Sequence, residues 1–247
     1  MHTLILGNGH LGEAIASAVA DAGWAPPAVL GRPSGGRHSA GDLIGADVVF
    51  DASRPDAVAT NVETALDAGC RSFVVATTGW TPDEPLLERM LVAADAAAVV
   101  APNLSLAMAV FMRLVERSAA LFAPLEIFEP FVLEWHRRNK LDRPSGTARE
   151  LVRRIDAGRG TADAGGSATR PIEVASVRAG ASPGMHAVGW DAAGETLEIR
   201  HTARDRSAYA AGAVAAARWL TAERREPGIH PFDAVVDGLL ERVPMGV

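Results

Sequence analysis

The residues with the clearest capacity for chemistry lie in one short run, EWHRRNKLDRPSGTA, at positions 134–148. His136 is a candidate acid or base because an imidazole titrates close to neutral pH. Lys140 is a candidate to neutralise a carboxylate or to deliver a proton, since its ammonium is a compact and mobile charge. Lys140 is the single lysine among 24 lysines and arginines. It either serves a purpose that arginine could not, or stands by chance at an exposed position.

The end of this run has the pattern of a helix start. Pro144 disfavours helical backbone at the residue before it. Thr147 and Glu150 have the spacing of a capping box, which predicts a helix from about Ala148. Backbone N–H groups near Gly146 and Thr147 would then point out from the positive end of the helix, ready for a carboxylate or a phosphate. Interpreted as structure alone, the Ser-Gly-Thr triplet is a helix cap and nothing more.

A second candidate site lies near the N-terminus, where the sequence GNGHLG occupies positions 7–12. An expected strand at 3–6 precedes it and an expected helix at 13–22 follows it, which is the context of a dinucleotide-binding fingerprint. The alternative is a glycine-rich turn in an α/β domain that binds no nucleotide. We predict cofactor contacts from all six residues of the loop: Gly7, Asn8, Gly9, His10, Leu11 and Gly12.

The end of the second expected strand, at 27–30, indicates which nicotinamide cofactor is bound. An NAD-specific site normally has an acidic residue there. The chain instead has Gly31 and Arg32, with no carboxylate before Asp42. Arg32 could form charge-assisted hydrogen bonds to a 2′-phosphate, so we favour NADPH, with NADH as a possible second cofactor. Arg37 competes for the same role, and both could be solvated loop arginines.

The order of elements predicts two domains. Strands and helices alternate up to about residue 107, which predicts a doubly wound, Rossmann-like parallel sheet. Beyond it, helices alternate with strand-like runs separated by Gly and Pro turns, which predicts a smaller α+β domain with an open, mixed sheet. We expect a dinucleotide-binding domain at 1–107, completed by 208–247, and a substrate-binding and oligomerisation domain at 108–207, with the active site between them. The expected strands are 3–6, 27–30, 47–50, 72–76, 98–101, 126–134, 172–177, 186–190 and 196–201; the expected helices are 13–22, 57–68, 84–97, 108–121, 148–157 and 208–220.

Composition excludes several classes of protein. A net charge of −6 gives no general attraction to nucleic acid or to anionic lipid. We expect no membrane span and no leader segment, because no apolar stretch is long enough. Cys70 is the single cysteine, so an internal disulfide is excluded and a reducing, cytoplasmic setting is expected. No clustered metal-ligand pattern is present, and we predict no metal site.

The run around His136 and Lys140, H-x-x-x-K-x-D-x-P-S-G-T-A, resembles the signature of the dihydrodipicolinate reductase family. Further stretches of the chain resemble motifs of that family in the same order. They are FDASRPD at 50–56, TTG at 77–79, APNLSL at 101–106, SVRAG at 176–180, GMH at 184–186, DR at 205–206, GA at 212–213 and WL at 219–220.

The resemblance implies a reaction and a homotetramer. A hydride would pass from NAD(P)H to the cyclic dicarboxylated imine derived from 4-hydroxy-tetrahydrodipicolinate, in lysine and diaminopimelate biosynthesis. It assigns acid–base catalysis to His136 and Lys140, and a small dicarboxylate substrate as the partner. The residues placed at the substrate are Arg137, Gly146, Thr147 and Arg206. The residues placed at the nicotinamide half of the cofactor are Ala76, Thr77, Thr78, Ala101, Pro102, Asn103 and Leu104.

Several positions depart from the family pattern. Arg137 stands where the family usually has a second histidine, and an arginine cannot shuttle protons near neutral pH. The glycine loop is one residue shorter than usual and has His10 in place of an arginine. Ala76 replaces a glycine and Leu104 a phenylalanine. Two alternatives therefore stay open: a reductase of the same family that acts on another cyclic imine in specialised metabolism, and a non-catalytic NADP(H)-binding protein.

Overall fold

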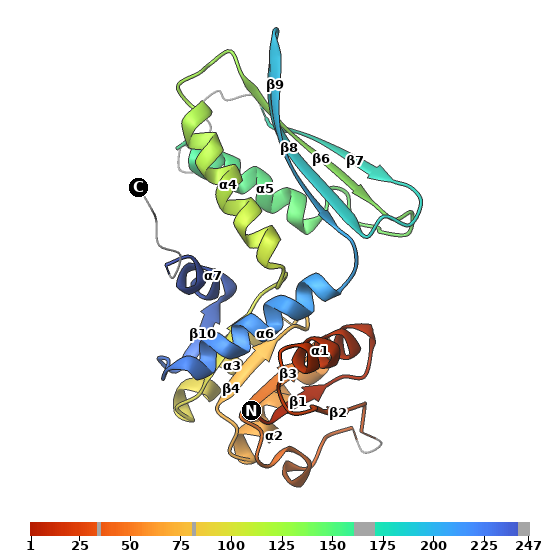
Figure 1. Ribbon diagram of the computed structural model, residues 1–247, viewed down its shortest axis with the longest axis vertical. Helices are drawn as coiled ribbons and strands as arrows, with labels where there is room; N and C mark the ends of the chain where they lie inside the picture. Colours follow the sequence, from red (N-terminus) through yellow and green to blue (C-terminus); the bar gives the residue numbers. More distant parts are fainter. Residues whose placement is uncertain (34–35, 81–82, 161–170, 242–247) are drawn as a thin grey trace. The chain divides into compact units, whose positions relative to one another are not determined.

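The structure is a computed structural model of the 247-residue chain, and it describes residues 1–33, 36–80, 83–160 and 171–241. The chain divides into two compact units. Unit 1 consists of Met1–Leu106 together with Arg206–Val247, and unit 2 consists of Ala107–Asp205. The chain therefore leaves unit 1 once, forms unit 2 as one continuous segment, and then returns to complete unit 1 (Figure 1).

Unit 1 is built on a six-stranded parallel sheet with the order β10-β5-β4-β3-β1-β2. Its strands are β1 (Thr3–Leu6), β2 (Ala28–Leu30), β3 (Val48–Asp51), β4 (Ser72–Val75), β5 (Ala97–Val100) and β10 (Gly228–Pro231). The strand order reverses between β1 and β3, and ligands of such sheets bind beyond the carboxyl ends of the strands at this switch point. The glycine loop at 7–12 follows β1 directly.

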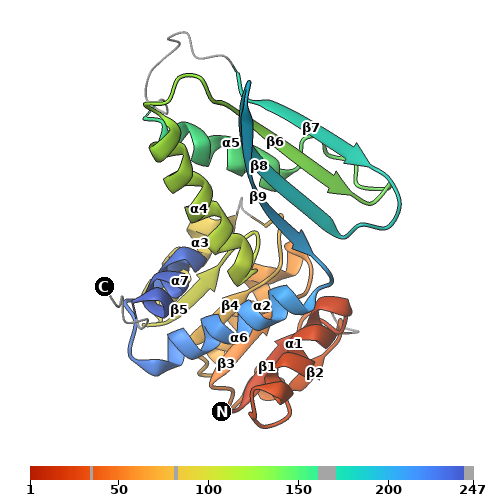
Figure 2. The same cartoon turned by 45° about the horizontal axis from the view of Figure 1, so that its top comes forward.

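Helices cover both faces of this sheet. They are α1 (His10–Asp21), α2 (Val58–Asp67), α3 (Glu84–Ala93), α6 (Ser207–Ala222) and α7 (Phe232–Leu240), with short 3₁₀ turns η1 (Ala40–Leu43) and η2 (Pro55–Ala57). Leu4 and Leu6 of β1 pack into a core with α2 and α3, whereas Ile5 between them is buried on the opposite face. That face carries α6 beside α1, as both views show (Figure 2).

Unit 2 is a four-stranded mixed sheet, ordered β7-β6-β8-β9, with two helices packed on one face. Its elements are α4 (Leu106–Phe122), β6 (Glu129–His136), α5 (Gly146–Gly158), β7 (Glu173–Arg178), β8 (Gly184–Ala192) and β9 (Glu195–Ala203). β6 pairs in parallel with β7 and antiparallel with β8. Met112 and Val115 of α4, Leu151 of α5, and Val132 and Trp190 of the sheet share one core.

The predicted fold class, a parallel Rossmann-like sheet with a second, mixed sheet, is confirmed. Two elements were not predicted, the strand β10 and the helix α7. The strand GIHP contains one glycine and one proline and has a single aliphatic residue, Ile229. It joins the sheet because β5 offers it a parallel partner, which a local pattern does not reveal.

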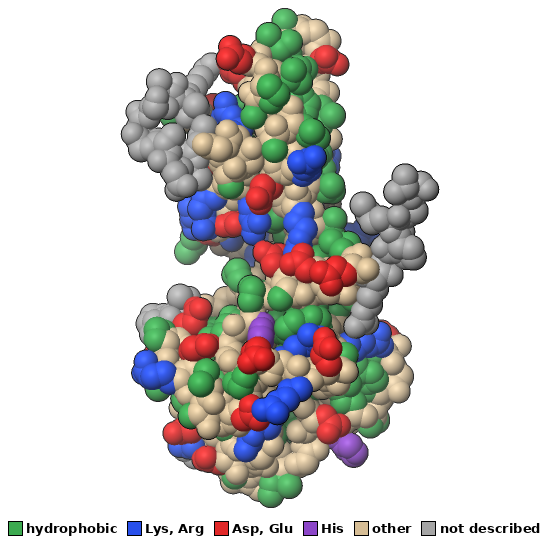
Figure 3. Space-filling model, turned by 90° about the vertical axis from the view of Figure 1, so that its left-hand side faces the viewer, with side chains coloured by type: hydrophobic (Ala, Val, Ile, Leu, Met, Phe, Trp, Pro, Cys, Tyr) green, Lys and Arg blue, Asp and Glu red, His purple; other side chains and the backbone are tan. Residues whose placement is uncertain are grey.

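On the face drawn in Figure 3, acidic and basic side chains are interspersed. Within the described residues, no helix combines the length and the hydrophobicity that a membrane span requires.

Two glycines of the loop after β1 give a test of the packing in unit 1. A Cβ on Gly12 would lie 1.9 Å from the carbonyl oxygen of Gly7, whereas a Cβ on Gly9 would meet nothing within 4 Å. We therefore expect Gly12→Ala to lower the free energy of unfolding by about 1–3 kcal/mol through overpacking. The matched control Gly9→Ala should cost less than about 1 kcal/mol. Urea unfolding measures both, and equal midpoints for the two variants would contradict this packing.

Candidate functional site

Five of the residues predicted to bind substrate or to catalyse lie together in unit 2, where β6 ends and α5 begins. They are His136, Arg137, Lys140, Gly146 and Thr147. Arg206, predicted to bind the same substrate, belongs instead to unit 1. The reason is local, because the Arg206 carbonyl accepts hydrogen bonds from Tyr209 and Ala210 and so begins α6, which packs on the parallel sheet.

His136 is the last residue of β6, two residues beyond the predicted end of this strand. Alternation along the strand puts Val132, Glu134 and His136 on the same face of the sheet, and all three are buried. That face is the one covered by α4 and α5. The His136 ring lies edge-on to the ring of His186 from β8, with 4.9 Å between the centroids.

The start of α5 differs from the predicted capping box. Ser145 is the N-cap, with extended backbone, and its Oγ accepts a hydrogen bond from the N–H of Ala148 at 3.1 Å. The helix therefore begins at Gly146, and the predicted cap by Thr147 and Glu150 is wrong. The cause is that Ser145 side chain and backbone are both held in a buried polar cluster. Gly146 is exposed and Thr147 is partly exposed at the N-terminal end of the helix, as the anion-binding prediction requires.

Lys140 is paired with a side chain of its own loop. Its Nζ lies 2.9 Å from Oδ1 of Asp142, and about a third of the Lys140 side chain is exposed. The hydrogen bond from Lys140 is the main cause that lowers the pKa of Asp142, and the backbone N–H of Gly146 also contributes. The Asp142 carboxylate is thus paired with Lys140, one of the groups that were predicted to hold a carboxylate of the substrate.

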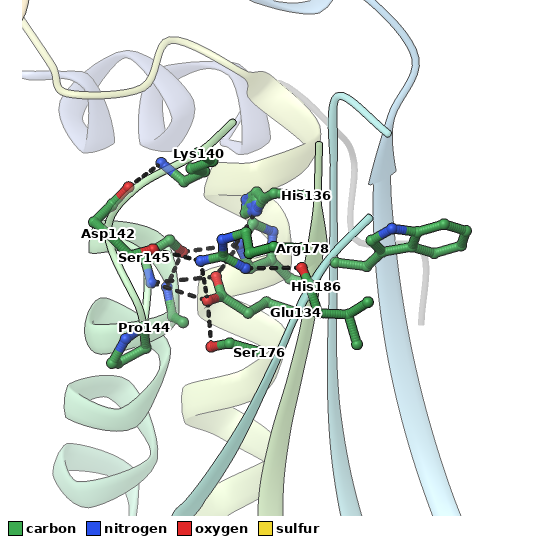
Figure 4. A network of polar contacts seen from close by, with 12 residues as sticks. Glu134, His136, Lys140, Asp142, Pro144, Ser145, Ser176, Arg178 and His186 are labelled. Carbon is green, nitrogen blue, oxygen red and sulfur yellow. Dashed lines mark hydrogen bonds and ion pairs between the residues drawn. The ribbon is translucent and has the colours of Figure 1, made fainter. Parts of the chain in front are cut away.

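A wholly buried carboxylate, that of Glu134, lies at the centre of the site (Figure 4). Its Oε1 accepts hydrogen bonds from Ser176 Oγ at 2.5 Å and from Arg178 Nη2 at 2.7 Å. The backbone N–H of Ser145 donates to both carboxylate oxygens, at 3.1 and 3.3 Å. Although burial favours the neutral acid, the hydrogen bonds from Ser145, Ser176 and Arg178 lower the pKa of Glu134 to about 2. Glu134 is therefore a fixed negative charge at physiological pH.

Burial favours the uncharged form of the two histidines beside Glu134. Burial lowers the pKa of His136, against the opposing attraction of the Glu134 carboxylate. Burial lowers the pKa of His186 to about 4, and repulsion from His136 adds to this effect. Neither ring hydrogen-bonds the carboxylate, since Oε2 lies 3.9 Å from His136 Nδ1 and 3.8 Å from His186 Nε2. A neutral His136 is ready to accept a proton or to polarise a bound ring.

Glu134, His136 and His186 also have the composition of a metal site. One ligand atom from each lies within 4.8 Å of the others. However, the Arg178 guanidinium already bonds the carboxylate, and both side chains of this ion pair are fully buried. A divalent cation would therefore meet a fixed positive charge in the same cluster, which disfavours its binding. This set had not been foreseen, because its members come from two strands 50 residues apart in the chain.

In unit 1, the glycine loop has the backbone geometry of a dinucleotide site. Gly7 has φ +118° and donates to the Leu30 carbonyl at 2.8 Å, and a Cβ on it would clash with the Ala52 carbonyl. Gly9 precedes the first residue of α1, is exposed and faces open space. The loop thus leaves Gly9 and the N-terminus of α1 accessible, as the close approach of a pyrophosphate would need.

A second buried carboxylate, Asp51, orders the loops that follow β3 and β4. Its Oδ1 accepts from the Thr77 hydroxyl at 2.6 Å and from the Ser53 hydroxyl at 2.8 Å. Its Oδ2 accepts from the side-chain amide of Asn61 at 2.8 Å. Thr77, predicted to border the nicotinamide, is buried by these contacts, whereas Thr78 is exposed. Asp51 was part of a recognised motif but was not predicted as a site residue.

The remaining predicted cofactor residues also lie beyond the carboxyl ends of strands. Ala76 follows β4 and is buried, and Ala101 follows β5. Asn103 accepts a hydrogen bond from the Ser105 N–H through its side-chain oxygen at 2.9 Å. Pro102 is exposed, whereas Leu104 is buried.

Arg32 and Arg37, the two candidates for the 2′-phosphate of the cofactor, and Arg137, a candidate for the substrate, are all exposed. Arg37 is occupied by α2, since its Nη2 lies 3.0 Å from Glu63 Oε2 and its Nε donates to the Thr64 hydroxyl at 2.9 Å. Arg32 lies close enough to Asp56 to contribute to the lowered pKa of that carboxylate, after the larger effect of Arg54. The backbone carbonyl of Arg137 accepts a hydrogen bond from the Lys140 N–H, and this contact does not involve the Arg137 side chain.

Sequence reasoning missed the residues that organise the site: Glu134, Ser145 and His186, which are buried, Arg178, whose side chain is buried, and Ser176, which is partly exposed. One signal for Glu134 was available. In the pattern Val132-Leu133-Glu134-Trp135-His136, the acidic residue occupies a position that alternation assigns to the core, and a buried charge needs a partner. Arg178, that partner, is 44 residues away, so local spacing could not identify it.

Comparisons with known proteins match both parts of the chain to one family. The family described as "Dihydrodipicolinate reductase, N-terminus" matches residues 1–104, and "Dihydrodipicolinate reductase, C-terminus" matches residues 107–236. The 4-hydroxy-tetrahydrodipicolinate reductase of Wolinella succinogenes is 34% identical over 199 residues, which is 76% of this chain and 75% of that protein. The protein of the same name from Archaeoglobus fulgidus is 34% identical over 200 residues, 77% of this chain and 76% of the relative.

A solved structure shares the fold. It is described as "Dipicolinate bound Dihydrodipicolinate reductase from Paenisporosarcina sp. TG-14" and superposes with a TM-score of 0.72. The superposition covers 94% of this chain and 97% of the other, at 19% sequence identity. At that identity the likeness supports the two-sheet architecture, while the sequence matches support the family.

The depressed pKa of His186 predicts how stability depends on pH. A group whose pKa is lower in the folded protein stabilises the fold above its unfolded pKa, here 6.5, and this stabilisation is lost as pH falls towards about 4. Between pH 7 and pH 5 the loss from His186 should be about 2 kcal/mol. We expect the variant His186→Gln to lose correspondingly less free energy of unfolding over this interval than the parent.

Urea unfolding at the two pH values measures this difference. The matched control is His2→Gln, which removes a solvent-exposed histidine and should follow the parent. Identical pH dependence in the parent and in His186→Gln would show that His186 is not buried in its neutral form.

Proposed function

Because both of its parts match that family, the chain belongs to the dihydrodipicolinate reductases, and we propose that it reduces the cyclic dicarboxylated imine derived from 4-hydroxy-tetrahydrodipicolinate. The product would be tetrahydrodipicolinate, and the hydride would come from a reduced nicotinamide. This places the reaction in the biosynthesis of diaminopimelate and lysine. The cofactor would be held by unit 1 and the imine by unit 2.

The main support for the proposal is that Lys140, His136 and the N-terminus of α5 are grouped together in unit 2. In Figure 4, Lys140 and His136 lie on the same side of the Glu134–Arg178 pair. A substrate carboxylate would be bound by the Lys140 ammonium and by the backbone N–H groups of Gly146 and Thr147, at the positive end of the helix. Arg137 and Arg206 are proposed as further contacts to the dicarboxylate.

Binding of the substrate would involve an exchange of carboxylates. Asp142 already pairs with the Lys140 ammonium in the free protein. A substrate carboxylate must displace Asp142 from this ammonium or share it. Because the substrate carries two carboxylates, it offers more charge to this site than the single side chain that it replaces.

The proton chemistry falls to His136 and Lys140. Addition of hydride to the conjugated imine develops negative charge on the ring, which must take up a proton. Because burial lowers the pKa of His136, we assign delivery of the proton to Lys140, with His136 as a group that polarises the ring or relays the proton. Both groups border the same carboxylate-binding end of α5.

The proposed cofactor is NADPH, with NADH as a second possibility. When bound, the nicotinamide supplies the hydride. The pyrophosphate would lie over Gly9 and the loop residues Asn8, His10 and Leu11, and the nicotinamide half beside Thr77, Thr78 and Asn103. Among the described residues after β2 there is no carboxylate before Asp42, and the competing Arg37 is already paired with Glu63. This leaves Arg32 as the proposed partner of the 2′-phosphate.

We also propose that the protein is a cytoplasmic homotetramer. Support for assembly comes from the face of the mixed sheet opposite its helices, where Trp135 and Val177 are cross-strand neighbours and are 43% and 42% exposed. Exposed apolar residues that adjoin on an open sheet are typical of an interface. The single, free and buried Cys70 fits a reducing compartment.

The reaction is tested by oxidation of NADPH in the presence of freshly prepared 4-hydroxy-tetrahydrodipicolinate. We expect turnover by the parent protein and a loss of about 100-fold or more in kcat/KM for Lys140→Ala, because it removes a positioned proton source. Arg153→Ala, which removes an exposed charge from α5, is the control and should keep parental activity. Turnover of another cyclic imine, but not of this substrate, would favour the alternative within the same family.

The choice of cofactor is tested at Arg32. Loss of charge-assisted hydrogen bonds to the 2′-phosphate should raise the KM for NADPH about tenfold to 100-fold in Arg32→Ala, and leave the KM for NADH unchanged. Arg37→Ala is the matched control, since it removes an arginine of the same loop that α2 already engages. A selective loss of NADPH binding in Arg37→Ala instead of Arg32→Ala would contradict the assignment.

A further inference from the structure

The ion pair between Glu134 and Arg178 is not explained by the stability of the fold. Both side chains are fully buried, and the Arg178 Nη2 lies 2.7 Å from Glu134 Oε1. Removing two charges from water is costly, and apolar residues of similar volume often stabilise a fold equally well or better. A buried pair kept beside a candidate active site therefore points to a role in its geometry.

The contacts of the pair reach both ends of the segment that binds the substrate. Glu134 accepts the N–H of Ser145, the residue immediately before α5. Arg178 Nη2 donates to the backbone carbonyl of Asp142 at 2.5 Å as well as to Glu134. The loop that carries Lys140 and the first turn of α5 are thus tied to one buried carboxylate through two backbone groups.

The same carboxylate faces His136. The two residues are neighbours on one face of β6, and Oε2 of Glu134 lies 3.9 Å from Nδ1 of His136. Among the described residues, this Nδ1 is buried without a hydrogen-bond partner. The other charged or titratable groups facing His136 are Arg178 from β7, His186 from β8, and Lys140 and Asp142 from the loop.

We infer that Glu134, held by Arg178, is a positioning residue that fixes the Lys140 loop and the start of α5 relative to His136 and sets the charge that His136 experiences. The inference rests on the proposed function, in which these three elements hold the dicarboxylate substrate and supply a proton to its ring. Glu134 acts through its neighbours, because its own oxygens are occupied by Ser145, Ser176 and Arg178.

The decisive variant is Glu134→Gln, which keeps the shape of the side chain and removes its charge. Ser176→Ala is the matched control, because it removes a donor to the same oxygen without changing any charge. Three measurements separate position from folding: the affinity for pyridine-2,6-dicarboxylate, the affinity for NADPH, and the titration of His136 by NMR of carbon-13-labelled histidine. The His136→Gln variant assigns the resonance.

For Glu134→Gln we expect kcat/KM and the affinity for pyridine-2,6-dicarboxylate to fall about 100-fold, as expected for a displaced binding group. The affinity for NADPH should stay unchanged, since unit 1 is untouched. The pKa of His136 should fall further, because the carboxylate that opposes the effect of burial is gone. Ser176→Ala should change the affinity for the dicarboxylate less than about tenfold and leave the titration of His136 in place.

Glu134→Asp covers the case in which the glutamine variant does not fold. It keeps a buried charge for Arg178 but withdraws the carboxylate from the Ser145 N–H by one methylene group. We expect weaker binding of the dicarboxylate, with a smaller change in the titration of His136 than in Glu134→Gln. Parental affinity in Glu134→Asp would overturn the positional half of the inference.

The inference as a whole would be overturned if Glu134→Gln kept the parental affinity for pyridine-2,6-dicarboxylate and the parental titration of His136. Effects of Glu134→Gln equal to those of Ser176→Ala would also overturn it. The titration is carried out on the free protein and requires no turnover. If the parent does not reduce the proposed substrate and His136 still responds to Glu134, then the proposed function fails while the charge effect stands. If the parent is active but the pKa of His136 does not change in Glu134→Gln, then the proposed function stands while the charge effect fails.

Discussion

A buried negative charge on Glu134 is the constraint on which the geometry of unit 2 depends. A carboxylate in this environment is tolerated only if each of its oxygens finds donors, and the donors come from two separate segments: Ser145 before α5, and Ser176 and Arg178 on β7. Satisfying one charge therefore brings two strands and one helix start together. His136, Lys140 and the N-terminus of α5 are arranged around this centre as a consequence.

Unit 1 solves a similar problem with Asp51, which ends β3 and collects donors from Ser53, Asn61 and Thr77. Loops beyond the carboxyl ends of parallel strands are where nucleotide ligands bind, and such loops need order without bulk. Glycines allow the tight backbone packing of the loop at 7–12, and a buried carboxylate holds the loops after β3 and β4. In both units a buried acid holds a residue next to the groups proposed to touch ligands: Asp51 holds Thr77 in unit 1, and Glu134 holds the Ser145 N–H in unit 2.

The sequence was sufficient for those parts of the fold whose causes are local. Alternating apolar strands and amphipathic helices indicated the parallel sheet, and the spacing of Gly7, Gly9 and Gly12 indicated the loop that follows β1. Contacts between segments far apart in the chain could not be inferred from the sequence. β10 exists because β5 offers an edge, β6 continues to His136 because β7 and β8 pair with it, and Ser145 caps α5 because Glu134 holds its N–H. The second segment of unit 1 begins at Arg206, two residues before the expected 208, because the Arg206 carbonyl accepts the first hydrogen bonds of α6.

We propose that the start of α5 and Lys140 form the carboxylate-binding part of the site, with Glu134 beneath them. A crystal structure of the protein with pyridine-2,6-dicarboxylate and oxidised cofactor would decide whether they do. The predicted result is a ligand carboxylate that accepts hydrogen bonds from the N–H groups of Gly146 and Thr147 and pairs with Lys140, while Glu134 still holds the Ser145 N–H. A ligand bound elsewhere, with Lys140 still paired to Asp142, would contradict the claim.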